Sequence, residues 1–157
     1  MAVGNRRPRA VAALAGIVGL ATLAGCGSSN RVAVDAPRPT GQIASACANL
    51  IARLPDDLAV GERRRPTRPT SPYTAAFGDP PVIVRCGVAI PRYDPTADVL
   101  TVGGVEWLLL PGGSNSRQRF LAYHSDLRVE VTVDAPELPA NVLPPVSTLV
   151  AAATKTP

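Results

Sequence analysis

The sequence predicts an α+β fold, a two-layer sandwich in which an antiparallel sheet of about four or five strands carries an N-terminal and a C-terminal helix on one face. Three observations favour it. An apolar stripe of helical spacing follows residue 40, β-rich segments occupy residues 82–133, and a second helical stripe follows residue 141. Each element has one apolar face, and two layers bury those faces economically against each other.

The N-terminal helix is predicted between Thr40, its N-cap, and Pro55, because proline pushes the residue before it out of the helical region. Apolar side chains between these limits recur three and four positions apart, as on one face of an α-helix. The stripe contains Ile43, Ala46, Cys47, Leu50, Ile51 and Leu54.

The strands are predicted from three segments. Residues 82–88 form a β-branched run typical of a mostly buried strand. Residues 105–110 end at a Pro-Gly-Gly turn, and the returning strand of this hairpin begins at residue 120. Residues 127–133 alternate apolar and polar side chains, which predicts a half-buried strand with one side in water. Residues 141–153 then form a short amphipathic helix with two prolines in its first turn.

Residues 1–25 are predicted to be a signal peptide. Three arginines precede an uncharged apolar run of about 15 residues, whereas a membrane-spanning helix needs about 20. The motif Leu23-Ala24-Gly25-Cys26 resembles the bacterial lipobox. This resemblance implies that Cys26 receives a diacylglyceryl group and that cleavage makes it the mature N-terminus.

The predicted localisation is therefore the extracytoplasmic face of the cell membrane, since two acyl chains anchor a protein stably where one binds marginally. The alternative is a chance cysteine beside a conventional cleavage site. Residues 26–40 hold small, polar and proline residues, which predicts a flexible tether beyond the lipid. Residues 41–157 remain as a single extracytoplasmic domain.

The charge of the mature chain excludes one class of partner. The full sequence has a net charge of +4, but removal of the leader leaves 13 basic and 12 acidic residues. A strongly basic domain is the first requirement for nucleic-acid binding. The sequence therefore predicts no nucleic-acid partner.

Two cysteines remain after lipidation, Cys47 and Cys86. In an oxidising compartment such a pair most simply forms a disulfide, and two free buried thiols are the alternative. A metal site is not expected, because His124 is the only histidine and no Cys-x-x-Cys spacing occurs. No cofactor is predicted either.

A basic run between Arg63 and Arg68 is open to two interpretations. It could contact phosphates or anionic lipid head groups. It could equally be an exposed edge strand or loop that charge and proline protect from pairing, which we favour because no aromatic or glycine-rich element accompanies it.

Several short motifs occur together in the mature domain. They are Cys47, Leu54-Pro55, Arg64-Arg65-Pro66-Thr67, Gly78-Asp79-Pro80-Pro81, Arg85-Cys86-Gly87-Val88, Gly104-Val105-Glu106-Trp107 and Val129-Glu130-Val131. In this combination the chain resembles the small actinobacterial lipoproteins grouped as domain of unknown function 3515, over about residues 40 to 153. The resemblance implies an extracytoplasmic membrane address, supports the disulfide and supplies no catalytic residues. Phe77 departs from the pattern, since tryptophan is expected before Gly-Asp-Pro.

No complete catalytic set is evident in the sequence. His124, Ser125 and Asp126 are neighbours on a predicted turn, and such neighbours rarely point at one spot as a triad requires. We interpret His124 as an exposed turn residue. Glu106 and Glu130 could act as paired carboxylates only from separate strands, and strand carboxylates more often face solvent.

The best candidates for ligand contact are Glu106 and Trp107, which face opposite sides of one strand. Burial in the core is the favoured interpretation of Trp107. In the alternative, its ring stacks on sugars or peptides of the envelope, with Tyr73, Phe77 or Arg85 nearby.

Together these features predict a lipid-anchored, extracytoplasmic module without enzymatic activity that binds an envelope protein or a cell-wall component. Two alternatives remain open. One is a small cell-envelope enzyme that acts on glycan or peptide, and the other is a structural subunit of an envelope assembly.

Overall fold

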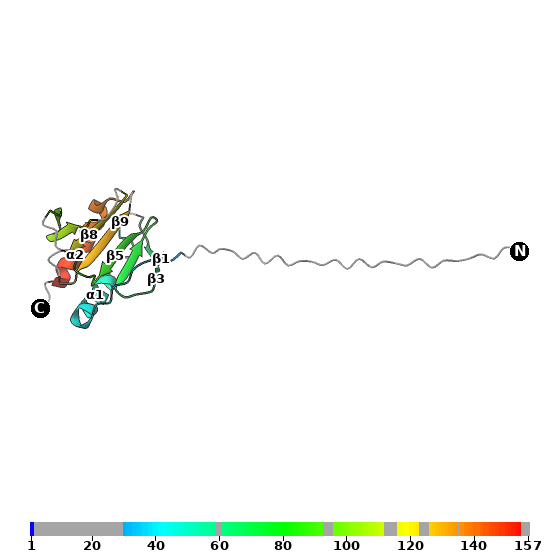
Figure 1. Ribbon diagram of the computed structural model, residues 1–157, viewed down its shortest axis with the longest axis horizontal. Helices are drawn as coiled ribbons and strands as arrows, with labels where there is room; N and C mark the ends of the chain where they lie inside the picture. Colours follow the sequence, from blue (N-terminus) through cyan, green and yellow to red (C-terminus); the bar gives the residue numbers. More distant parts are fainter. Residues whose placement is uncertain are drawn as a thin grey trace.

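The computed structural model describes Met1 and residues 30–58, 61–92, 96–111, 116–122, 126–134 and 136–154 (Figure 1). Most of the predicted signal peptide, Cys26 and His124 lie outside these residues. Within them, no helix combines the length and the apolar character needed to cross a membrane.

Two helices and nine strands make up the described part of the chain. The helices are α1 (Gly41–Arg53) and α2 (Pro139–Thr154). The strands are β1 (Val32–Ala33), β2 (Arg64–Arg65), β3 (Thr67–Arg68), β4 (Thr74–Phe77), β5 (Val82–Cys86), β6 (Val99–Val102), β7 (Val105–Leu109), β8 (Arg117–Ala122) and β9 (Val129–Asp134). Seven strands form an antiparallel sheet in the order β2-β4-β5-β9-β8-β7-β6, and β1 pairs in parallel with β3.

The α+β class is confirmed, but the predicted sheet of four or five strands is too small, since the sheet has seven. The additional strands carry weak local signals. β4 is buried along its whole length and β2 has two residues, so neither alternates, while β6 is largely exposed. Gly103 and Gly104, at φ of 59° and 76°, form the two-residue turn that joins β6 to β7.

Both helices pack on one side of the sheet and contact each other, and their buried side chains belong to one apolar cluster with those of β4, β5, β7, β8 and β9 (Figure 1). Helix α1 begins after Thr40 and ends before Pro55, as the stripe predicts. Helix α2 begins two residues earlier than predicted, at Pro139, so its internal prolines lie in the second turn rather than the first.

The disulfide is confirmed in the structure. Cys47 of α1 and Cys86 at the end of β5 are bonded, with 5.4 Å between their Cα atoms, and both side chains are fully buried. The bond ties the N-terminal helix to the sheet and closes a loop with a sequence separation of 39.

Strand β9 is buried on both sides, so the predicted solvent-facing side is wrong. Its valines belong to the main apolar cluster, while Glu130, Thr132 and Asp134 alternate with them and are also buried. The reason is position, because β9 is the middle strand of the seven. Arginine side chains from β5 and β8 cover its polar side and bond its carboxylates.

Residues 31–40 belong to the domain rather than to a flexible tether, which corrects the predicted boundary between residues 40 and 41. Val32 is buried, its backbone N–H donates to the carbonyl of Pro66, and β1 pairs with β3. The backbone N–H of Val34 donates to the carbonyl of Arg68. The folded unit therefore includes β1.

The basic run contributes structural bonds at the edge of the sheet. Arg64 in the edge strand β2 donates from Nη2 to the carbonyl of Ile51 (2.8 Å) and from Nη1 to that of Leu54 (3.3 Å), and so caps the end of α1. Arg65 donates to the carbonyl of Gly78 at 2.7 Å. These contacts favour the edge-strand interpretation of the run.

Candidate functional site

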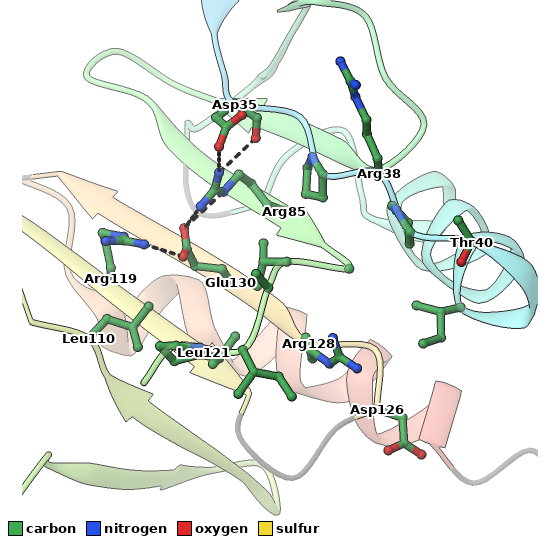
Figure 2. Close-up of a pocket in the computed structure, with 18 residues that line it drawn as sticks. Asp35, Arg38, Thr40, Arg85, Leu110, Arg119, Leu121, Asp126, Arg128 and Glu130 are labelled. Carbon is green, nitrogen blue, oxygen red and sulfur yellow. Dashed lines mark hydrogen bonds and ion pairs between the residues drawn. The ribbon is translucent and has the colours of Figure 1, made fainter. Parts of the chain in front are cut away.

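A groove of about 740 Å³ lies on the side of the sheet opposite the main apolar cluster, over β5, β8 and β9 (Figure 2). The segment between β1 and α1 forms one wall. The lining combines charged and apolar side chains, namely Arg38, Arg85, Arg119 and Arg128; Asp35, Asp126 and Glu130; and Ile43, Val88, Ile90, Leu110 and Leu121. Its volume falls in the range of small-molecule sites, about 300–1,000 Å³.

Strand register brings the central charges of the groove together. Arg85 lies opposite Glu130 across β5 and β9, and Leu121 of β8 lies opposite Glu130 on the other side. Residues in register share a face of the sheet. The charged and apolar parts of the groove are therefore direct neighbours.

Glu130 is held by two arginines (Figure 2). Its Oε1 accepts bonds from Nε (3.1 Å) and Nη2 (2.8 Å) of Arg85, and its Oε2 accepts one from Nη2 of Arg119 (2.7 Å). The Glu130 side chain is 3% exposed. A buried carboxylate needs such pairing, and here both of its oxygens are engaged.

Asp35 links the N-terminal wall to this cluster. Nη1 of Arg85 donates to the Asp35 backbone carbonyl at 2.9 Å and to its Oδ2 at 3.2 Å. The Asp35 side chain is 97% exposed, so its charge pairing contributes little to stability.

Gly87 allows this wall to approach the sheet. A side chain at Gly87 would lie 2.7 Å from Cβ of Pro39, and the glycine has a φ of 83°. The motif Arg85-Cys86-Gly87-Val88 thus supplies an ion pair, the disulfide, a close approach and part of the groove lining.

Arg128 lies directly before β9 and has a left-handed backbone, with a φ of 48°. Its carbonyl accepts the backbone N–H groups of Gly87 (3.2 Å) and Val88 (3.3 Å). The side chain is half-buried in the groove, and it forms no hydrogen bond or ion pair with the residues that the structure describes.

An acidic cluster lies elsewhere, around Glu62. Burial raises the pKa of Glu62, and the nearby charges of Glu137, Asp57 and Asp79 raise this pKa further. Its Oε2 is buried without a hydrogen-bond partner and occupies the space that a side chain at Gly78 would need. Among the described residues, no group of three or more potential ligands is arranged to hold a metal ion.

The predicted stacking platform is not assembled on the surface. Trp107 is fully buried, and its Nε1 donates to Oγ of Ser147 at 2.9 Å. Phe77 is fully buried as well, and Tyr73 packs against the same core. Glu106 is exposed on β7. Both large rings therefore lie in the core, as the favoured interpretation of Trp107 predicts. The alternative, a Trp107 ring exposed for stacking on a ligand, is wrong.

The predicted pair of carboxylates is also divided, because Glu130 lines the groove and Glu106 does not. His124 and Ser125 lie outside the described residues, while Asp126 is exposed at one end of the groove. Sequence reasoning missed Arg119 and Arg128 altogether. The available signal was the alternation of Arg117 and Arg119 along β8, which places both arginines on the face of the sheet that carries Glu130 and Asp134 of β9.

The fold and the groove define a small, disulfide-linked α+β domain with a charged cavity on one face of its sheet. The chain belongs to the family described as "Protein of unknown function (DUF3515)", whose model matches residues 8–157. This match confirms the resemblance to that family. No curated protein and no solved structure shows a significant match to the chain.

Proposed function

We propose that the chain is a lipid-anchored protein of the bacterial cell envelope, exposed on the extracytoplasmic face of the membrane, and that it binds a molecule of the envelope without chemical conversion. The observation that carries the binding role is the groove of about 740 Å³ beside the Arg85–Glu130–Arg119 cluster. An envelope protein or a cell-wall component remains the proposed source of the partner.

Two features support the extracytoplasmic address. The lipobox-like motif ending at Cys26 follows an apolar run of signal-peptide length. The disulfide between Cys47 and Cys86 is typical of proteins that fold in an oxidising compartment. The family match begins at residue 8, so it includes the apolar run.

Binding is favoured over catalysis by the state of Glu130. General acid catalysis or nucleophilic attack on a sugar requires a carboxylate oxygen that reaches the substrate. Both oxygens of Glu130 accept bonds from Arg85 and Arg119, and the side chain is only 3% exposed, so either reaction would first have to break these ion pairs. Among the described acids of the groove, the envelope-enzyme alternative would have to use the exposed Asp35 and Asp126.

The anchor is tested by Cys26→Ser in cells that export the chain. Serine cannot form the thioether, so the variant should incorporate no radiolabelled palmitate and should persist as uncleaved precursor. Ser28→Ala, two residues away, is the matched control and should be labelled and processed normally. Normal palmitate incorporation into Cys26→Ser would contradict the anchor.

The binding role is tested by photo-crosslinking in living cells. A photoreactive residue replaces Ile90, which is exposed in the groove wall, or Ala152, which is exposed on α2. Specific adducts should form from position 90 and not from position 152. Adducts from position 152 alone would instead favour a structural subunit that docks through its helices.

A further inference from the structure

The backbone at Arg128 is costly for an arginine. Its φ of 48° lies in the left-handed region, where the Cβ atom of any residue other than glycine approaches the following carbonyl too closely. The carbonyls of Leu127 and Arg128 fix the turn, since the Leu127 carbonyl accepts the N–H of Gly87 and the Arg128 carbonyl accepts those of Gly87 and Val88. A glycine would make the same bonds without the steric cost.

The side chain of Arg128 forms no hydrogen bond or ion pair with the described residues that would offset this steric cost. It is half-buried in the groove, yet its guanidinium has no partner among the described residues. A partly desolvated cation without a partner is unfavourable. The arginine therefore suits a molecule that enters the groove from outside better than it suits the folded chain alone.

The charges around Arg128 favour an anionic group. Four arginines and three acidic residues line the groove. Glu130 is already neutralised by two arginines, and Asp35 is bonded to Arg85. Asp126 is exposed at the end of the groove near Arg128 (Figure 2). Arg38 is exposed, so Arg128 is the half-buried cation of the groove that has no anionic partner among the described residues.

Apolar side chains lie beside these charges. A second, smaller apolar cluster is formed by Val88, Leu108, Leu110 and Leu121, and all of these but Leu108 line the groove. Leu121 lies between Arg119 and Arg128 (Figure 2). Ile90 extends this lining and is 70% exposed, one of few large apolar side chains left in water. A small inorganic anion would contact the arginine and leave this surface uncovered.

We propose that the groove binds an amphiphilic anion, a molecule with a phosphate or carboxylate head and an apolar chain. Arg128 binds the head, and the chain lies against Val88, Ile90 and Leu121. This proposal rests on the proposed role of the groove as a binding site, and it adds the chemical class of the ligand.

The test uses decyl phosphate that carries a photoreactive diazirine in its chain, with the purified full chain in phosphatidylcholine nanodiscs. Irradiation should label the peptide that contains residues 88–91, and unlabelled decyl phosphate should compete. Inorganic phosphate and decyltrimethylammonium should compete at least about tenfold less well, since each lacks one half of the ligand. Equal competition by either compound would overturn the proposal.

Arg128→Gly separates binding from folding. The variant should lose about tenfold in labelling, the value of one charge-assisted bond, while its melting temperature stays the same or rises. Arg53→Gln, which removes an exposed cation at the end of α1, is the control and should label normally. Unchanged labelling of Arg128→Gly, or a large fall in its melting temperature, would overturn the proposal.

Ile90→Ser tests the apolar half independently. Because Ile90 is mostly exposed, the substitution should leave folding intact and reduce labelling about threefold through the lost apolar contact. Unchanged labelling would contradict the placement of the chain. Intact mass of the same sample reports acylation of Cys26, so failure of the anchor and failure of the groove are seen separately.

Discussion

The two faces of the sheet differ in the chemistry of the side chains that cover them. On one face, α1 and α2 cover a continuous apolar cluster. On the other, the same strands present Arg85, Arg119 and Glu130 in a bonded cluster beside a groove. Strand β9 contributes to both faces, with its valines on one and its acidic side chains on the other. A single strand pattern therefore serves two purposes.

This difference shows where stability and specificity reside. Apolar burial contributes about 25 cal/mol per Å² removed from water, so the helix-covered face supplies most of the folding free energy. Buried ion pairs add little net stability, because desolvation offsets their attraction. The charged face is thus the part of the sheet that stability alone does not explain, and it is where we place the ligand.

The largest expected effect concerns the helix-covered face. Replacing both Cys47 and Cys86 with alanine should lower the free energy of unfolding by about 4 kcal/mol, because the disulfide restricts the unfolded chain. Urea denaturation of the variant and of the wild type measures the difference. A loss below about 1 kcal/mol would show that α1 needs no covalent tie to the sheet.

The next effect concerns the charged face. Glu130→Gln should cost about 3 kcal/mol, because it leaves the guanidinium groups of Arg85 and Arg119 without their carboxylate. The triple variant Arg85→Met, Glu130→Leu, Arg119→Met should recover this loss or exceed wild-type stability. Urea denaturation compares the two. A triple variant less stable than Glu130→Gln would contradict the division of roles between the faces.

A smaller effect tests the polar bond that is buried with the Trp107 ring. Ser147→Ala should cost about 1.5 kcal/mol, since the indole N–H of Trp107 loses its acceptor inside the core. Thr148→Ala, on the exposed side of the same helix, should change stability by less than about 0.5 kcal/mol. Thermal denaturation distinguishes them, and equal losses would argue against the bond.

The smallest effect lies at Glu62, near the edge of the sheet. Its pKa in the folded state is raised above the ordinary value of 4.5, so folding favours the protonated form. The stability that this form provides is complete below pH 4.5 and is lost as the pH rises through the raised pKa. Glu62→Gln should therefore gain about 0.5 kcal/mol at pH 7 and almost nothing near pH 4.

Asp98→Asn, an exposed acid on the other edge of the sheet, is the control for Glu62→Gln. Denaturation midpoints at the two pH values measure both variants. A Glu62→Gln protein that is less stable than wild type at pH 7 would show that the carboxylate is favourable there, against the direction of its pKa.

The helices could be predicted because their signals are local. The stripe of α1 and its limits at Thr40 and Pro55 lie within one short segment, and the structure reproduces them. Strands β4 and β6 were not predicted, because they are recognised as strands by their pairing with neighbouring strands and not by a pattern in their own residues. β4 is buried on both sides between β2 and β5, so it lacks the alternation that marks a half-exposed strand.

Even less of the candidate site could be predicted from the sequence, because the site depends on the register in which the strands pair. Glu130 and Arg85 are 45 residues apart in sequence and meet only because β9 pairs with β5. Trp107 stands out in the sequence as the single tryptophan and is therefore a candidate ligand contact, but it is buried in the core and lies outside the groove. At Arg128 the informative property is the positive φ of its backbone, which the sequence around an arginine does not predict.

The pairing of β1 with β3 also limits how far the folded domain can lie from the membrane. Six residue steps separate Val32 from Cys26, and a fully stretched chain spans at most about 3.6 Å per step, or about 20 Å. Given the acylation proposed for Cys26, this short connection keeps Val32, where the folded body is attached, within about 20 Å of the bilayer surface. Such a protein would meet molecules that lie at the membrane surface or leave it. It would not contact the parts of the cell wall that are farther from the membrane.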